Sequence, residues 1–126
     1  MSWQAYVDTN LVGSGKVTKA AILGQQGGVW ATSAGYNITD VEQKAILAAL
    51  SNPDSALASG LKLAGVKFLT VKADDRSIIG KQGPKGYTIV GTKQAVLVAE
   101  YDAPTQAQES TLIVEGLADY LIGLSY

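Results

Sequence analysis

The chain contains neither cysteine nor histidine. Without cysteine it has no disulfide, no thiolate nucleophile and no sulfur ligand for a metal. Without histidine it lacks Ser-His-Asp and Cys-His arrangements, imidazole metal ligands and the commonest general base near neutral pH. No other group of residues in the sequence suggests a small hydrolase or transferase. We therefore expect a protein that is not an enzyme and that holds no metal and no cofactor.

A long apolar run is also missing. No stretch reaches the roughly 18 consecutive apolar residues of a membrane-spanning helix, and no basic segment precedes an apolar run at the start of the chain. Hydrophobic residues make up 47% of the 126 positions and charged residues 17%, which is typical of a compact globular protein. This length predicts one domain over residues 1–126, and the default compartment is the cytoplasm.

Basic residues are absent from residues 94–126, which carry five acidic residues and a net charge of −5. The preceding segment, residues 61–93, has seven basic residues against Asp74 and Asp75 and a net charge of +5. The sequence thus predicts a basic surface and an acidic surface on one small body. Two interpretations are open: each is an ordinary solvated face of a sheet or helix, or the middle of the chain binds an acidic partner.

The predicted elements follow the order helix, strands, helix, strands, helix, in a single α+β unit. Ser2 can cap a first helix over residues 3–12, which the glycines that follow would end. Thr39 or Asp40 can cap a second helix, which is expected to end at about Leu50, where the sequence reads SNPD.

Short turns separate the predicted strands, and short connections favour antiparallel neighbours. The first two strands form a hairpin in which Trp30 points to the face opposite Val29 and Ala31. A later stretch folds back at Ala64 and Gly65 and counts as one strand or two. The predicted strands span residues 16–23, 30–35, 61–73, 77–82, 86–91 and 94–101.

After Pro104 the apolar residues change to a helical period, which predicts a long amphipathic helix. Glu115 and Asp119 lie opposite its apolar side, which consists of Ile113, Leu117, Tyr120, Leu121 and Leu124. If this helix and the first helix lie side by side on one face of the sheet, they bring together four aromatic residues, Trp3, Tyr6, Tyr120 and Tyr126.

Four stretches make the sequence resemble the profilin family over essentially its whole length. They are MSWQAYVDTNLVGSGKV at the start, AAILG and VWATSAG in the first hairpin, ADDRSIIGK in the middle and VEGLADYLIG near the end. The resemblance implies a central antiparallel sheet of six to seven strands, with the N- and C-terminal helices packed on one face and smaller helices on the other.

The resemblance also implies a function. Profilins bind monomeric actin, proline-rich segments of actin-assembly factors such as formins, and acidic phosphoinositides, and thereby regulate actin polymerisation. We accordingly expect a cytoplasmic protein of the cytoskeleton that is monomeric and has no nucleic-acid partner.

A polyproline II segment presents an apolar ridge and backbone carbonyls that make no internal hydrogen bond. Aromatic rings can lie against the pyrrolidine rings while indole N–H and tyrosyl O–H groups donate to those carbonyls. By resemblance, the groove for such a ligand maps to Trp3, Tyr6, Trp30, Tyr120, Leu121 and Tyr126. The alternative is that these rings merely seal the two terminal helices against the sheet.

By the same resemblance, the actin-binding surface comes from the later strands and the start of the last helix. The positions are Lys67, Lys72, Arg76, Ile79, Lys81, Thr88, Gln106 and Thr111. Lys81 fits the family pattern best, whereas Ile79 departs from it, because relatives often have tyrosine or arginine there. The segment STLIVEG also replaces a more usual Gly-Glu-Ala opening of the helix. The alternative is a profilin-like module for proline-rich ligands with weak or lost actin binding.

Phosphoinositides are expected at the basic middle of the chain. The residues that the resemblance and the charge pattern assign to them are Lys67, Lys72, Arg76 and Lys81. Several basic side chains near one acidic membrane surface attract it by about 1 kcal/mol each, and salt screens this attraction.

Overall fold

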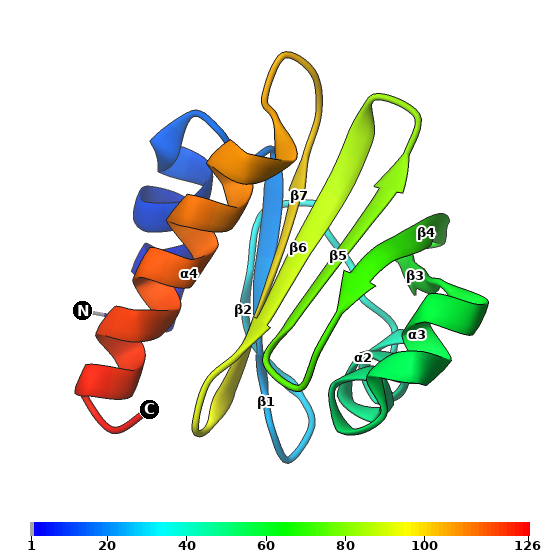
Figure 1. Cartoon of the computed structure of the whole chain (residues 1–126). Helices are drawn as coiled ribbons and strands as arrows, with labels where there is room; N and C mark the ends of the chain where they lie inside the picture. Colours follow the sequence, from blue (N-terminus) through cyan, green and yellow to red (C-terminus); the bar gives the residue numbers. More distant parts are fainter. Residues whose placement is uncertain (1) are drawn as a thin grey trace.

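Seven antiparallel strands form one sheet in the computed structural model, which describes residues 2–126. Their order across the sheet is β2-β1-β7-β6-β5-β4-β3, so the last strand lies between the first hairpin and the middle strands (Figure 1). The strands are β1 (Lys19–Gly24), β2 (Val29–Thr32), β3 (Leu61–Leu63), β4 (Val66–Ala73), β5 (Ser77–Gln82), β6 (Lys85–Gly91) and β7 (Ala95–Tyr101).

The two ends of the chain cover one face of this sheet. The N-terminal helical run consists of α1 (Trp3–Ala5), the π-helical η1 (Tyr6–Leu11) and the 3-10 turn η2 (Val12–Ser14). It lies beside the long C-terminal helix α4 (Ala107–Gly123), and both chain ends are on this side (Figure 1). Val7, Leu11, Leu97 and Val114 are fully buried in the apolar cluster that joins these helices to the sheet.

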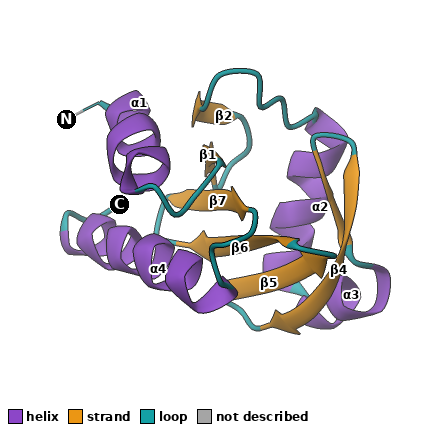
Figure 2. Cartoon of the chain, turned by 90° about the horizontal axis from the view of Figure 1, so that it is seen from above, coloured by secondary structure: helices purple, strands orange, loops and turns teal. Residues whose placement is uncertain are grey.

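The opposite face carries α2 (Asp40–Ser51) and α3 (Pro53–Ser59), as Figure 2 shows from above. A second buried cluster, which includes Ile46, Phe68 and Tyr87, fills the space between these helices and the sheet. The predicted fold class is therefore confirmed: an α+β protein with a seven-stranded sheet, terminal helices on one face and smaller helices on the other.

Local sequence signals explain several element boundaries. Ser2 accepts a hydrogen bond from the backbone N–H of Ala5, as predicted for a helix cap. Thr39 caps α2 in a capping box with Glu42, since each side chain accepts from the other residue's backbone N–H. The predicted fold-back at 64–65 separates β3 from β4, because Ala64 and Gly65 both adopt positive φ.

The pattern of residues did not predict α3. Pro53 was expected only to stop the preceding helix, but it also occupies the first position of the next one, where its missing N–H costs nothing. The first helix also differs, since the predicted residues 3–12 change from α-helical to π-helical at Tyr6.

The buried side of α4 is rotated from the predicted apolar stripe. It consists of Ser110, Val114, Leu117, Ala118 and Leu121, whereas Tyr120 and Leu124 are exposed. The rotation occurs because the helix is covered by the sheet on one flank and by η1 on the other. Within residues 2–126, no helix combines the length and the apolar character needed to cross a membrane.

Candidate functional site

Four aromatic rings from both chain ends and the first hairpin form one cluster. The ring centroid of Trp3 lies 5.6 Å from that of Tyr6, 4.8 Å from that of Trp30 and 5.1 Å from that of Tyr126. Tyr120 extends the cluster along α4, with its ring centroid 6.3 Å from that of Tyr6. All five aromatic residues predicted for the groove are therefore brought together.

Three of these rings are open to solvent. Trp30 is 38% exposed, Tyr126 41% and Tyr120 55%, and contiguous exposed rings of this kind are typical of a binding surface. Rings that only sealed the helices against the sheet would be covered. Leu121, the sixth predicted residue, is fully buried beneath the rings, so it supports the cluster from below.

The position of Trp30 depends on a bulge in the first hairpin. Ile22 pairs with Ala31 and Leu23 pairs with Val29, so Trp30 has no partner in β1. The sequence predicted Trp30 on the face opposite Ala31 by strict alternation, and that prediction is wrong. A bulge inserts one residue and redirects its side chain, which here contacts Trp3 on the face where Ala31 is also buried.

Gly24 makes room for this redirected ring. A Cβ atom at position 24 would lie 2.6 Å from Nε1 of Trp30, well inside van der Waals contact. The N-terminal helix is held against the same hairpin by Gln4, whose amide donates to the backbone oxygen of Thr32 at 2.8 Å. Trp3 and Trp30 are thus placed by contacts outside their own rings.

The backbone around Tyr126 is held by the turn between β6 and β7. The Thr92 hydroxyl donates to the backbone oxygen of Tyr126 at 2.8 Å, and the backbone N–H of Gln94 donates to the same oxygen. The Gln94 side chain donates to the backbone oxygen of Ser125 at 2.9 Å. These contacts orient the Tyr126 ring toward Trp3.

The cluster offers donors as well as apolar faces. Burial, reinforced by the neighbouring Tyr120 and Tyr126, raises the pKa of Tyr6 above the usual tyrosine range. Its hydroxyl therefore stays protonated at neutral pH and can donate a hydrogen bond. Together with the indole N–H groups, such donors suit backbone carbonyls that have no partner within their own chain.

A hollow of about 380 Å³ adjoins the cluster between η1 and α4. Its lining includes Tyr6 and Tyr120 from the cluster, together with Asn10, Leu112, Ile113, Gly116 and Leu117. The last five were not predicted as site residues. The only sequence signal for them is the helical spacing of residues 112, 113, 116, 117 and 120, which is equally expected of a core-facing stripe.

A second surface lies on the same face of the sheet, across β4, β5 and β6. Strand pairing places Lys72 beside Ile79 and Ile79 beside Thr88. The Thr88 hydroxyl lies 3.4 Å from that of Thr111 on α4, so this row continues onto the helix. Lys81 pairs with Leu69, whose side chain is 72% exposed. Four of the residues predicted for actin therefore share one surface: Lys72, Ile79, Lys81 and Thr111. Thr88 is fully buried beneath α4, so it can support this surface but cannot contact a partner.

Two other predicted residues, Lys67 and Gln106, lie outside this surface. Lys67 lies opposite Lys62 in the β3–β4 pair and lines a hollow of about 230 Å³ beside Val41 of α2. Gln106 precedes α4, where its backbone N–H donates to Glu109 at 3.0 Å.

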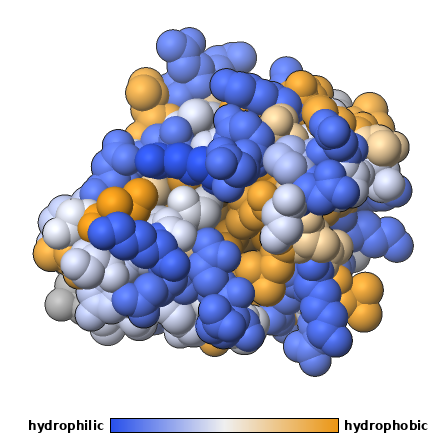
Figure 3. All heavy atoms as spheres, turned by 60° about the horizontal axis from the view of Figure 1, so that its bottom comes forward, coloured by the Kyte–Doolittle hydropathy of each residue, from blue (hydrophilic) through white to orange (hydrophobic). Residues whose placement is uncertain are grey.

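Seen from the end where the β6–β7 turn lies in Figure 1, the apolar atoms form separate patches among hydrophilic ones (Figure 3).

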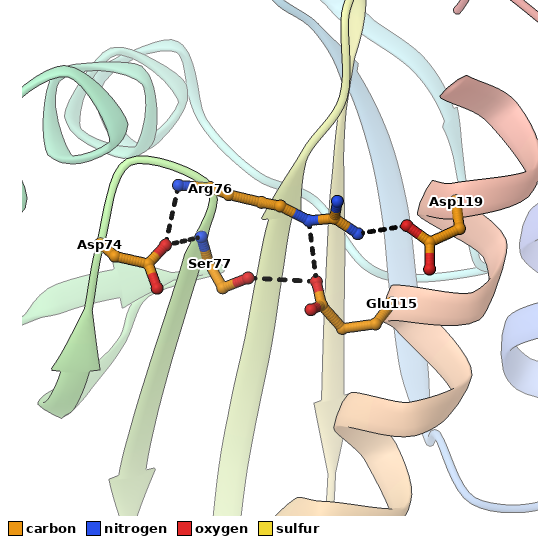
Figure 4. A network of polar contacts seen from close by, with 5 residues as sticks. All are labelled: Asp74, Arg76, Ser77, Glu115 and Asp119. Carbon is orange, nitrogen blue, oxygen red and sulfur yellow. Dashed lines mark hydrogen bonds and ion pairs between the residues drawn. The ribbon is translucent and has the colours of Figure 1, made fainter. Parts of the chain in front are cut away.

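Arg76 is engaged within the protein rather than free. Its guanidinium donates to Asp119 at 2.7 Å and to Glu115 at 3.3 Å, and both acidic residues lie on α4 (Figure 4). The Ser77 hydroxyl also donates to Glu115, at 3.1 Å. Two of the five acidic residues in the segment 94–126, Glu115 and Asp119, therefore pair with a basic residue of the segment that precedes it.

The turn before β5 positions this arginine. One carboxylate oxygen of Asp74 accepts from the backbone N–H groups of Ser77 at 2.7 Å and Arg76 at 2.8 Å. These two bonds hold the pKa of Asp74 below its usual range. The hydrogen bond to Asp119 is the main cause that raises the pKa of Arg76, so the guanidinium stays charged.

Comparison with known proteins places this geometry in one family. The family described as Profilin matches residues 1–126. The chain is 51% identical to profilin-1A of Acanthamoeba castellanii over 126 residues, which is 100% of both chains. The structure of profilin IB of the same organism matches with a TM-score of 0.96 at 50% identity and covers 99% of this chain and 100% of that chain. Mouse profilin IIa, solved in complex with a double repeat from the FH1 domain of mDia1, matches in fold with a TM-score of 0.84 at 23% identity and full coverage of both chains.

Proposed function

The chain belongs to the profilin family, and we propose that its aromatic cluster binds proline-rich segments while the β4–β6 surface binds monomeric actin. Profilins are non-enzymatic proteins that bind actin monomers and polyproline. The proposal assigns these two activities to the two surfaces described above. It also makes this chain a monomeric, single-domain protein of the cytoplasm and its actin cytoskeleton.

One observation carries the proline-rich assignment. Trp3 lies within 5.6 Å of three other aromatic rings, and two of these, Trp30 and Tyr126, remain substantially exposed. A polyproline II helix has flat apolar faces and unpaired carbonyls on every turn, which exposed rings with N–H and O–H groups can satisfy together. Formins are the proposed partners, because the related mouse profilin was solved with a formin-type FH1 repeat.

The assignment to actin rests on the composition of the second surface. Lys72 and Lys81 flank the half-buried Ile79, and the exposed Leu69 lies next to Lys81. An apolar centre with a charged rim is the usual composition of a specific protein interface. The departure at Ile79 therefore supplies apolar area at the centre and does not remove the site.

The two surfaces are separate enough for simultaneous binding. A specific protein partner covers about 800 Å² of each surface, roughly a tenth of a small protein. The aromatic cluster comes from the two chain ends and β2, whereas the actin residues come from β4, β5, β6 and the start of α4. The protein would then act as an adaptor that holds an actin monomer close to a proline-rich assembly factor and raises its local concentration.

Phosphoinositide binding is proposed for the same basic strands. Three of the four candidates, Lys67, Lys72 and Lys81, make no ion pair among residues 2–126. Lys72 and Lys81 are the main ones, because Lys67 lines the hollow beside α2. Arg76 is expected to contribute less, because Glu115 and Asp119 already neutralise it. Because Lys72 and Lys81 are proposed for both partners, lipid and actin should compete for this surface.

The test is a pair of titrations on the same preparation. Intrinsic tryptophan fluorescence should change on addition of an oligoproline peptide, since Trp3 and Trp30 both lie in the proposed site. Monomeric actin should bind in the presence of saturating peptide. A fluorescence response without any actin binding would favour the alternative of a proline-rich module, and absence of both would contradict the proposal.

A further inference from the structure

The hollow between η1 and α4 continues the aromatic cluster. Tyr6 and Tyr120 line the hollow and also contact each other within the cluster, at 6.3 Å between ring centroids. A ligand that lies along Trp3 and Tyr6 therefore reaches the hollow without leaving the protein surface. At about 380 Å³, the hollow has room for a large aliphatic side chain and its neighbours.

A larger side chain could fill the hollow without a clash, yet the chain has glycine at this point. Gly116 lies in the middle of α4, and a Cβ atom there would meet no other atom within 4 Å. Glycine inside a helix is less stable than alanine, so Gly116 weakens the helix and leaves space beside it. On the other wall, η1 is π-helical over Tyr6–Leu11, a geometry that occurs frequently at functional sites.

The lining suits a residue other than proline. Leu112, which is 68% exposed, and Ile113 provide apolar walls. Asn10 offers an amide that makes no side-chain hydrogen bond to any residue among 2–126. Such an amide can bind both the N–H and the C=O of a peptide unit. Proline has no N–H, so full use of Asn10 needs a non-proline residue at this point.

We propose that this hollow binds an aliphatic side chain, such as leucine, that adjoins the proline run in the same ligand. The inference rests on the proposed proline-rich function of the aromatic cluster and adds a preference for sequence to it. Polyproline II advances about 3.1 Å per residue, and the steps from Trp3 to Tyr6 and from Tyr6 to Tyr120 are 5.6 and 6.3 Å. The aliphatic residue thus lies roughly four residues beyond the proline on Trp3.

The experiment uses a plain run of eight prolines and four peptides that extend this run by one residue. Leucine or alanine is added at the N-terminal or the C-terminal end, because either ligand direction is allowed. Tryptophan fluorescence titration of the full chain gives each Kd. One leucine peptide should bind about five- to tenfold more tightly than its alanine partner, as expected for burial of the additional methylene groups. NMR should detect that leucine close to the methyl groups of Ile113.

Two variants test whether the preference for leucine arises in the hollow. Gly116→Leu fills the hollow, so the leucine and alanine peptides should bind this variant equally well. Its affinity for the plain proline run should stay within about twofold of the wild-type value. Gly123→Leu is the matched control, because a Cβ atom at position 123 would also meet no atom within 4 Å, and Gly123 does not line the hollow. That variant should keep the ratio.

The possible outcomes distinguish failure of the proposed function from failure of the further inference. If plain oligoproline does not bind, the proposed function and the occupant of the hollow both fail. If oligoproline binds but leucine and alanine peptides are equal at both ends, only the hollow's assignment fails. If Gly116→Leu weakens actin binding and keeps the leucine preference, the hollow belongs to the actin-binding surface, and the inference is overturned.

Discussion

The ring centroids of Trp3 and Trp30 lie 4.8 Å apart, and this contact depends on a bulge in an edge strand. Trp30 is the extra residue of that bulge, between the pairs that Ala31 and Val29 form with β1. Without the bulge, alternation along β2 would direct the Trp30 ring to the other face of the sheet. An irregularity in strand pairing thus completes the aromatic cluster.

Trp3→Ala should weaken oligoproline binding at least about tenfold, the usual effect of losing a central aromatic anchor. Trp3 is only partly buried, so thermal unfolding should stay cooperative. Fluorescence of the remaining Trp30 reports the titration, and circular dichroism reports the melt. Leu124→Ala, which removes an exposed apolar side chain outside the cluster, should leave the affinity unchanged. Loss of the cooperative melt would show that Trp3 serves the core instead.

Gly24→Ala should also weaken oligoproline binding, by about threefold, although Gly24 itself makes no contact with the proposed ligand. The added methyl group would lie 2.6 Å from Nε1 of Trp30 and would displace that ring. A shift in tryptophan emission should accompany the loss. Gly123→Ala, where the methyl group meets no atom within 4 Å, is the control. Unchanged affinity in Gly24→Ala would mean that Trp30 is not part of the groove.

Much of the fold could be predicted because its signals are local. Residues 77–82 were predicted as a strand and form β5 with those bounds. Thr39 or Asp40 was predicted to cap α2, and Thr39 does so in a capping box with Glu42 that the sequence analysis did not identify. The short α3 was missed because Asn52 both ends α2 and precedes Pro53, so that one segment stops a helix and starts another.

The candidate sites could be predicted only in part. Helical periodicity placed Tyr6 and Tyr120 on facing margins of two helices, and these rings do meet. The ion pairs of Arg76 with α4 could not be found, since they depend on how far apart β5 and the helix pack. The hollow beside Gly116 depends in the same way on the distance between η1 and α4, which no local pattern encodes.

Lys81→Glu should reduce actin affinity about tenfold or more and leave oligoproline binding unchanged. Lys81 lies on β5 beside Gly86 and Leu69, outside the aromatic cluster. Lys44→Glu is the matched charge reversal on α2, which covers the other face of the sheet, and should affect neither ligand. Loss of oligoproline binding in Lys81→Glu, or displacement of actin by the peptide, would contradict two independent sites.

Lys72→Gln should weaken binding to phosphoinositide vesicles more than Arg76→Gln does. The Arg76 guanidinium is held by Glu115 and Asp119 and would have to break these ion pairs to contact a lipid phosphate, whereas Lys72 makes no ion pair among residues 2–126 and can contact the phosphate directly. Vesicle co-sedimentation at low and high salt measures both variants, and binding should fall steeply with salt. Salt-independent binding would contradict an electrostatic site.

Glu100→Gln should stabilise the protein at pH 8 and have little effect at pH 4. Glu100 is only 6% exposed on β7. Burial raises the pKa of its carboxyl above the usual range, and the nearby Tyr36, Lys19 and Lys85 oppose this only in part. The folded state therefore holds the Glu100 proton more tightly than the unfolded chain does. As pH rises from the ordinary carboxyl pKa through the raised one, the wild-type free energy of unfolding loses this contribution.

Glutamine stays neutral at every pH, so the difference in melting temperature between Glu100→Gln and wild type should grow from pH 4 to pH 8. Asp54→Asn, which removes an exposed carboxylate on α3, gives the baseline for an ordinary acidic residue. Oligoproline affinity should not change, because Glu100 alternates with Val96 and Val98 toward the face covered by α2 and α3, away from Trp3. A constant difference across this pH range would mean that the buried carboxylate carries no cost, and that Lys19 and Lys85 fully compensate its charge.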